Sequence, residues 1–241
     1  MRRLSDASEY LDGGLSDRAT LLGNLRDLRR VNAIFGGAEL SLRAMRGLIE
    51  QDTPLDPTGL GTLRVLDVGT GAADIPARML RDRGPWSAIH VTAVDSRPEI
   101  IEAALLLEPS LARDANLSMA VADGRTLPYP DAAFDVAHAS LVLHHLEPGD
   151  AIAFLRELRR IARIGIVVND LQRSRLGWLG ARLILHVLSR NRFTIHDGPL
   201  SVRRAYTRPE ARALLAEAGL RPVREIVGIA GHRWAIAAVP T

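Results

Sequence analysis

The chain has 241 residues, of which 47% are hydrophobic and 24% charged, and its formal net charge is +3. This length suffices for one sizeable domain, or for one domain with an added cap. The sequence contains no cysteine, which excludes disulfide scaffolds, thiolate metal sites and cysteine nucleophiles. All 31 cationic residues are arginine, so no lysine can act as a base or form a Schiff base.

Two absences bear on location. No apolar run approaches the roughly 18–20 residues that are needed to span a bilayer. The first residues, "MRRLSDASEYLDGG", lack the apolar core of a secretory signal. We therefore expect a cytoplasmic protein without a transmembrane segment.

Residues 17–51 have a helical pattern of apolar side chains. Leu21, Leu25 and Leu28 recur at helical spacing, and Gly36–Gly37 separates them from a second apolar stripe over 40–49. We predict an N-terminal helical cap here. The stretch "DTPLDPTGLGT", residues 52–62, has the composition of a linker.

From residue 63 onward, short apolar runs alternate with helical stretches. The runs are "RVLDVG", "IHVTAVD", "NLSMAVAD", "FDVAHAS" and "IGIVVND", and the helices between them include 72–83, 98–107 and 149–163. Such alternation favours a parallel, doubly wound sheet, which we place in a cofactor-binding core at 63–170. Residues 207–241 add a helix and two strand-like runs, "VREIVGIA" and "HRWAIAAV", that we expect to pair antiparallel.

The predicted fold is therefore α/β, a single domain over 1–241. Its Rossmann-like sheet is mostly parallel and seven-stranded, with an antiparallel last strand, an N-terminal helical cap and a helical insertion after the fifth strand.

The insertion, residues 171–206, follows the fifth strand at the edge where doubly wound folds bind ligands. We interpret it as a lid or a substrate pocket, the alternative being a solvated helix that covers the sheet. Its arginines could bind an anionic group of a substrate or the phosphates of a nucleic acid. They include Arg173, Arg175, Arg190, Arg192, Arg203 and Arg204.

The stretch "VLDVGTGAADIP", residues 65–76, has the form of a ligand-binding turn between a strand and a helix. Gly69, Thr70 and Gly71 form the turn, but Asp74 stands where a dinucleotide fingerprint has its third glycine. Asp67 would repel a pyrophosphate. The turn therefore suits a cofactor that has a cationic centre and no phosphate.

Two further acids follow predicted strands. Asp95 ends the second strand at the spacing where a carboxylate binds ribose hydroxyls, and Asp123 ends the third. Each alone could be a solvated turn acid. Three strand ends that each carry an acid at the same edge of the sheet favour a shared ligand site.

Residues 65–170 resemble the class I S-adenosylmethionine-dependent methyltransferases. The resemblance implies that Asp67 and the glycine turn hold the methionine and ribose parts of the cofactor, although Ala73 stands where many members have glycine. It also implies that the remaining positions bind ribose, the adenine edge and the amino group of the cofactor. These are Asp95, Ser96, Asp123, Gly124 and Ser140.

The catalytic candidates follow the fourth and fifth strands. In some small-molecule O-methyltransferases a histidine of an "HH" pair acts as base and an acid after the fifth strand orients it; His144 and Asp170 match those positions, with His145 as the alternative histidine. A histidine can take the proton of an attacking hydroxyl near neutral pH. The other interpretation is that "LHHL" packs and shields the cofactor.

We predict an enzyme that methylates the oxygen of a hydrophobic small molecule, of phenolic, polyketide-like or quinone-precursor type, and releases S-adenosylhomocysteine. No zinc-like histidine spacing is present, so we expect no metal. The alternatives are RNA methylation by the arginine-rich insertion, contact of that segment with a membrane surface, and a non-catalytic binding protein. Arg30 and Asn32 are expected near the cofactor or substrate, and the protein is expected to be a monomer or homodimer.

Overall fold

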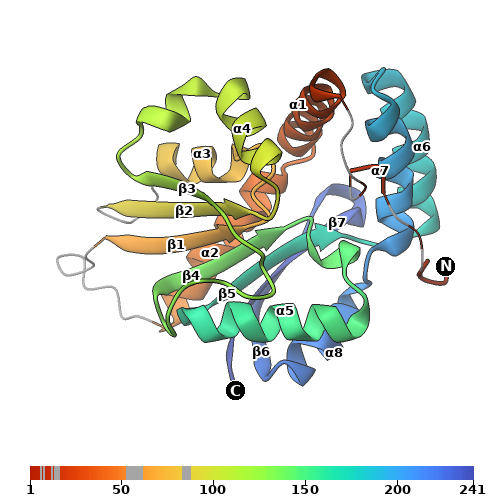
Figure 1. The fold of residues 1–241 in the computed structure, drawn as a ribbon. Coiled ribbons are helices and arrows are strands. Elements are labelled where there is room, and N and C mark those ends of the chain that lie inside the picture. The colour runs from red at the N-terminus through yellow and green to blue at the C-terminus, as the bar shows by residue number, and fades with distance from the viewer. Residues whose placement is uncertain (6, 8, 12, 14–16, 53–61, 83–87) are drawn as a thin grey trace.

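The computed structural model describes residues 1–5, 7, 9–11, 13, 17–52, 62–82 and 88–241. Figure 1 shows a central sheet with helices on both faces and a further group of helices beyond one end of the strands. The linker predicted at 52–62 falls almost entirely outside the described residues.

The sheet has seven strands in the order β3-β2-β1-β4-β5-β7-β6. The first five are parallel to one another, and β7 is antiparallel to both of its neighbours. The predicted α/β fold, with a mostly parallel sheet and an antiparallel last strand, is confirmed. The strands are β1 (Leu63–Val68), β2 (Ile89–Asp95), β3 (Leu117–Val121), β4 (Phe134–Ser140), β5 (Ala162–Leu171), β6 (Leu220–Val227) and β7 (Arg233–Pro240).

Eight α-helices are found among the described residues. They are α1 (Arg18–Ile34), α2 (Gly37–Asp52), α3 (Asp74–Arg81), α4 (Pro98–Leu107), α5 (Pro148–Ile161), α6 (Arg175–Leu188), α7 (Arg192–Arg204) and α8 (Arg208–Glu217). Short 3₁₀ turns lie at Pro109–Arg113, Leu143–His145 and Ile229–Gly231.

Alternation along β1 divides the core into two layers. Val65 packs with α2 and α3 on one face, whereas Leu66 and Val68 pack with α5 and α8 on the other. Successive side chains of a strand point to opposite faces, so a strand with helices on both sides reads as a nearly continuous apolar run. This is why Leu63, Val65, Leu66 and Val68 are all apolar and buried.

Helix α1 of the predicted N-terminal cap meets the insertion beyond the carboxyl ends of the parallel strands, whereas α2 packs against a face of the sheet. Helix α1 packs against α4 and α7, and α7 packs against α6 (Figure 1). Local signals fix these helices: Asp17 caps α1, Ser174 caps α6 and Asn191 caps α7, each accepting from backbone N–H groups of the first turn. The three helices wall in the end of the sheet where the acids lie.

Candidate active site

A cavity of about 880 Å³ lies between the carboxyl ends of the parallel strands and helices α1, α6 and α7. This volume is within the range of ligand sites in proteins. Most predicted site residues line it: Asp67, Gly69, Thr70, Gly71, Asp95, Ser96, Ser140, His144 and His145.

The glycine turn joins β1 to α3 with a left-handed backbone. Gly69 and Gly71 have φ of 71° and 53°, and a Cβ on Gly69 would lie 2.5 Å from Cγ2 of Val142. Both positions therefore favour glycine on conformational grounds. Thr70 lines the cavity, and its buried hydroxyl has no hydrogen-bond partner among the described residues. A buried hydroxyl without a partner is costly, so it indicates a ligand group at this turn.

Asp95 links the end of β2 to this turn. Its Oδ2 accepts from the Gly71 N–H and its Oδ1 from the Arg97 N–H, both at 3.2 Å. Burial raises the pKa of Asp95, against the stabilising effect of these two hydrogen bonds. Each carboxylate oxygen keeps a lone pair for a further donor, such as a hydroxyl of a ligand.

The carboxylate of Asp67 contacts a buried histidine, His138, that was not among the predicted site residues. His138 lies opposite Asp67 in the β1–β4 register, and its Nδ1 is 2.5 Å from Oδ1 of Asp67. Its Nε2 lies 2.8 Å from Oγ of Ser41 on α2. All three side chains are buried, so the carboxylate of Asp67 is fixed by the core rather than by solvent.

The polar network continues along the strand ends to β7. Asn169 donates to Ser41 Oγ at 2.7 Å, and its Oδ1 accepts from Nε of Arg233 at 2.5 Å. Arg233 also donates to Oδ1 of Asn32 at 2.6 Å and to Oγ of Ser140 at 2.8 Å. Burial lowers the pKa of Arg233 to about 10.

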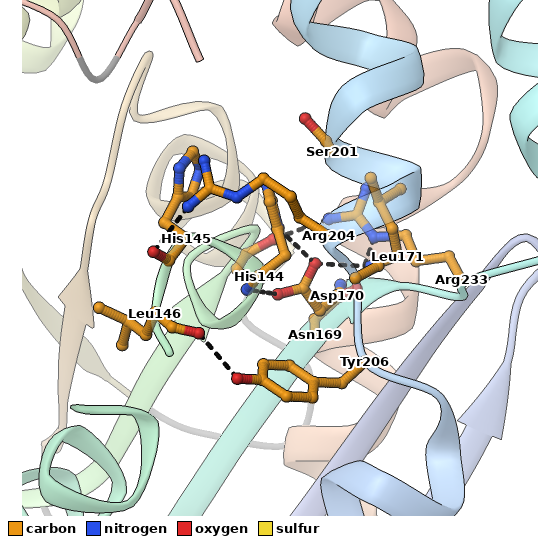
Figure 2. A network of polar contacts seen from close by, with 12 residues as sticks. His144, His145, Leu146, Asn169, Asp170, Leu171, Ser201, Arg204, Tyr206 and Arg233 are labelled. Atoms are coloured by element: carbon orange, nitrogen blue, oxygen red, sulfur yellow. Dashed lines mark hydrogen bonds and ion pairs between the residues drawn. The ribbon is translucent and has the colours of Figure 1, made fainter. Parts of the chain in front are cut away.

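His144, which follows β4, and Asp170, the second-last residue of β5, form a buried pair (Figure 2). The sequence predicted this pair but placed Asp170 after the strand. Nδ1 of His144 lies 2.7 Å from Oδ1 of Asp170, and the His144 backbone N–H donates to Oδ2 at 3.0 Å. Burial opposes ionisation of Asp170, but attraction to His144 and these hydrogen bonds outweigh it and hold its pKa below the usual value. Such a carboxylate fixes the orientation of the imidazole and leaves Nε2 for chemistry.

Glu9, from the segment before α1, reaches the other side of this pair. Its Oε1 lies 3.6 Å from Nε2 of His144, and its Oε2 lies 4.0 Å from Nε2 of His145. Ser201 donates to Glu9 at 2.9 Å, and Arg204 lies 3.8 Å from it. Sequence reasoning missed Glu9, because nothing in its local pattern marks it as a site residue.

Glu9, His144 and His145 are also the described residues whose potential ligand atoms converge, within 4.8 Å of one another, as a metal site requires. The guanidinium of Arg204 beside Glu9 would repel a cation there. That no metal is needed stays a prediction.

Asp123, Gly124 and Arg30 were predicted near the cofactor or substrate but do not line the cavity, and Asp170 reaches it only through His144. The carboxylate of Asp123 pairs with Arg125 at 2.8 Å, and these contacts lower its pKa; neither Asp123 nor Gly124 is among the lining residues. Arg30 donates to the carbonyl of Leu188 instead of facing the cavity, whereas Asn32 lines it. The role of Asp123 and Gly124 at the adenine edge stays a prediction.

The insertion arginines divide into two groups. Arg173 and Arg204 are buried and donate to backbone carbonyls, Arg173 to Ala205 and Arg204 to His145. Five remain exposed: Arg175, Arg182, Arg190, Arg192 and Arg203. Binding of RNA phosphates by the insertion therefore depends on these five and stays a prediction.

Helix α6 forms one rim of the cavity and exposes an apolar stripe. The stripe consists of Leu176, Leu179, Leu183 and Val187, of which Leu176 and Val187 are each 84% exposed. No helix in the described part of the chain has the length and apolar character to cross a membrane. Contact of α6 with a membrane surface stays a prediction.

Comparisons with known proteins agree with the fold. The family model described as "Methyltransferase domain" matches residues 65–165. Malonyl-[acyl-carrier protein] O-methyltransferase of Geobacter sulfurreducens is 32% identical over 169 residues, which are 68% of this chain and 58% of that protein. The chain thus spans little more than half the length of this relative.

Two solved structures resemble most of the chain. One is an O-methyltransferase family 2 protein from Planctomyces limnophilus in complex with apigenin, with a TM-score of 0.64 at 16% identity. The match covers 95% of this chain and 63% of that protein's chain. The other is magnesium protoporphyrin IX methyltransferase from Synechocystis with bound S-adenosylmethionine, with a TM-score of 0.60 at 14% identity. That match covers 95% of this chain and 99% of that protein's chain. At these identities the two structures establish the fold alone. The matches in sequence and in fold identify the chain as a member of the class I S-adenosylmethionine-dependent methyltransferases.

Proposed function

We propose that the protein transfers a methyl group from S-adenosylmethionine to a hydroxyl oxygen of a largely apolar small molecule. One observation carries this proposal: His144, which is paired with the buried Asp170, lines the same cavity as the glycine turn and Asp95. A base and a cofactor-binding turn on one cavity are what transfer to a protonated acceptor requires.

The lining residues suit the cofactor. The unpartnered hydroxyl of Thr70 and the remaining lone pairs of Asp95 can bind its ribose and methionine parts. When bound, S-adenosylmethionine supplies an electrophilic methyl group on a sulfonium sulfur and leaves as S-adenosylhomocysteine. Asp67 adds negative charge beside the turn, which favours a cationic ligand over a pyrophosphate.

His144 would accept the acceptor's hydroxyl proton at Nε2. Because Nδ1 is directed at Asp170, the neutral ring carries its proton there and presents a lone pair at Nε2. The imidazolium that forms is stabilised by the same carboxylate. Apolar side chains of α1 and α6, among them Leu28 and Ile184, line the cavity and suit an apolar acceptor.

A carboxyl acceptor is the second candidate, because the Geobacter relative is named for malonyl-[acyl-carrier protein]. A carboxylate is already ionised near neutral pH and needs no base to attack a methyl group. The buried His144–Asp170 pair therefore favours a hydroxyl acceptor over a carboxyl one.

A screen with methyl-labelled S-adenosylmethionine tests the proposal. We expect label transfer to neutral phenols and aromatic polyketides, and less transfer to malonyl-[acyl-carrier protein], aliphatic carboxylic acids and RNA. Label that appears in methyl esters alone would replace the hydroxyl acceptor with a carboxyl one. Calorimetry that detects no binding of S-adenosylhomocysteine would contradict the proposal and support a non-catalytic binding role.

The raised pKa of Asp95 predicts a pH dependence of cofactor binding. The ionised carboxylate accepts from ribose hydroxyls, and burial makes protonation occur at a higher pH than for an ordinary aspartate. Affinity for S-adenosylhomocysteine should therefore be constant near neutral pH and fall as the pH is lowered through the raised pKa. Calorimetric titration across the acidic range measures this, and Asp95→Asn should show weaker binding with a flatter pH profile. A fall of the same shape in Asp95→Asn would assign the dependence to another group.

A further inference from the structure

Arg233 begins β7 and lines the cavity, although it is almost fully buried, with 3% of its surface exposed. Its three hydrogen-bond acceptors are all neutral: Oδ1 of Asn169, Oδ1 of Asn32 and Oγ of Ser140. Within the described parts of the chain, no carboxylate forms an ion pair with its guanidinium. A buried charge usually has an ionic partner, so this arrangement is unusual for a purely structural arginine.

The donors of Arg233 are not all used. A guanidinium has five N–H groups, and the three hydrogen bonds leave one N–H on each terminal nitrogen. Two parallel N–H groups are the fork that binds a carboxylate through both of its oxygens. Asp170 and Asp74 attract the guanidinium only through space, and burial still lowers the pKa of Arg233 to about 10.

Several elements hold this guanidinium in place. Asn32 at the end of α1 accepts from Arg233 and donates to Oδ2 of Asp74 at 2.7 Å. Gly37 begins α2 at the same point, and a Cβ there would collide with Asn32 and Arg233. Asn169, which Figure 2 shows beside Arg233, is itself fixed by Ser41 and by the carbonyl of Gly37. The site is therefore rigid before any ligand arrives.

We propose that Arg233, set between Asn32, Ser140 and Asn169, is the receptor for a carboxylate group of a ligand in the cavity. The carboxylate belongs either to the methionine part of the cofactor or to the acceptor molecule. This deepens the proposed function and rests on it for the identity of the cofactor. The subsite itself rests only on the buried, incompletely paired guanidinium.

Matched ligand pairs that differ in a carboxylate test the subsite by calorimetry. The cofactor pair is S-adenosylhomocysteine and its decarboxylated analogue S-adenosyl-3-thiopropylamine, which lacks only the carboxylate. The second pair, for the acceptor, is benzoate and benzamide, titrated into the free protein and into protein saturated with S-adenosylhomocysteine. We expect the wild type to prefer the acid in one pair by at least about tenfold, which is the magnitude of hydrogen bonds to a charged group.

Arg233→Met removes the guanidinium and its charge and keeps an unbranched side chain that reaches as far as the position of Nε. It should remove that preference by weakening the acid about 10- to 100-fold, with a change of less than about threefold for the partner without a carboxylate. Arg233→Lys keeps the charge but not the fork, and should fall between the two proteins. Loss in the cofactor pair assigns the carboxylate to the cofactor, and loss in the benzoate pair alone assigns it to the acceptor.

Unchanged binding of S-adenosyl-3-thiopropylamine by Arg233→Met shows that the variant is folded. If that variant does not fold, the ligand preferences of the wild-type protein decide whether a carboxylate subsite exists. A wild-type protein that prefers neither acid over its partner has no such subsite. Equal preferences in the wild type and Arg233→Met overturn the proposal. A protein that binds neither nucleoside contradicts the proposed function, whereas its discrimination of benzoate from benzamide still decides the subsite.

Discussion

Replacing His144 with glutamine is expected to lower the rate of methyl transfer to a hydroxyl acceptor by about 10²- to 10⁴-fold, which is the usual contribution of a general base. Glutamine can hydrogen-bond to Asp170 but cannot accept a proton near neutral pH. The glycine turn and Asp95 are untouched, so the affinity for S-adenosylhomocysteine should change by less than about threefold. Single-turnover rates and calorimetry separate the two effects.

Asp170→Asn tests the same pair from its other side. The amide keeps the shape and buried position of Asp170 but loses the negative charge that stabilises the imidazolium. We expect a drop in rate that approaches that of His144→Gln, and a double variant little worse than either single one, because the two groups act as a unit.

His145→Gln is the matched control. Its ring lies against that of His144, with centroids 4.2 Å apart, but it has no hydrogen bond to Asp170. A small effect in this variant and a large one in His144→Gln would support His144 as the base. Unchanged turnover in His144→Gln would exclude His144 as a general base. A large loss in His145→Gln alone would assign the role of base to His145.

The strand-end acids could be predicted from the sequence because each follows its own apolar run. In a parallel sheet, the carboxyl ends of neighbouring strands meet at one edge, so Asp67 and Asp95 had to lie near each other. His144 follows β4 and Asp170 lies at the carboxyl end of the neighbouring strand β5, so the same reasoning brought them together. Local sequence patterns are sufficient where the geometry of a parallel sheet determines which residues lie close together.

The partners that arrive from remote segments could not be predicted in this way. Glu9 reaches His144 across 135 positions of sequence, and Arg233 meets Asn32 across 201. Neither lies in a motif, and their positions depend on how the N-terminal segment and β7 pack against the rest of the fold. His138 is different, since its place opposite Asp67 follows from the register of β1 and β4. A register argument could have found it.

The arginine-rich insertion shows why composition alone misleads about ligands. Six arginines were candidates for binding an anion, yet Arg173 and Arg204 are buried and bonded to the protein's own carbonyls. Arg233, which lies outside that segment, lines the cavity and keeps unused donors. Exposure and pairing, rather than the number of charges, determine which arginine can receive a substrate.

Asp95→Ala is expected to weaken the binding of S-adenosylhomocysteine by about 100-fold. The variant loses the carboxylate that can accept from the ribose and leaves the Gly71 N–H of the turn without its acceptor. Two hydrogen bonds to a charged group at about 1.5 kcal/mol each give this factor. Calorimetry measures it, and thermal unfolding shows whether the turn still folds.

Asp123→Ala is the matched control for Asp95→Ala, since it removes the same kind of side chain from the end of the next strand. Asp123 is paired with Arg125 and does not line the cavity, and an exposed ion pair contributes about 1 kcal/mol or less. Its loss should change the affinity by less than about fivefold if the adenine edge is read elsewhere. An effect as large as that of Asp95→Ala would instead place Asp123 at the adenine, because only a direct contact that replaces Arg125 could give it. Equal affinities in the wild type and Asp95→Ala would remove the ribose role of Asp95 and leave the turn without its proposed ligand.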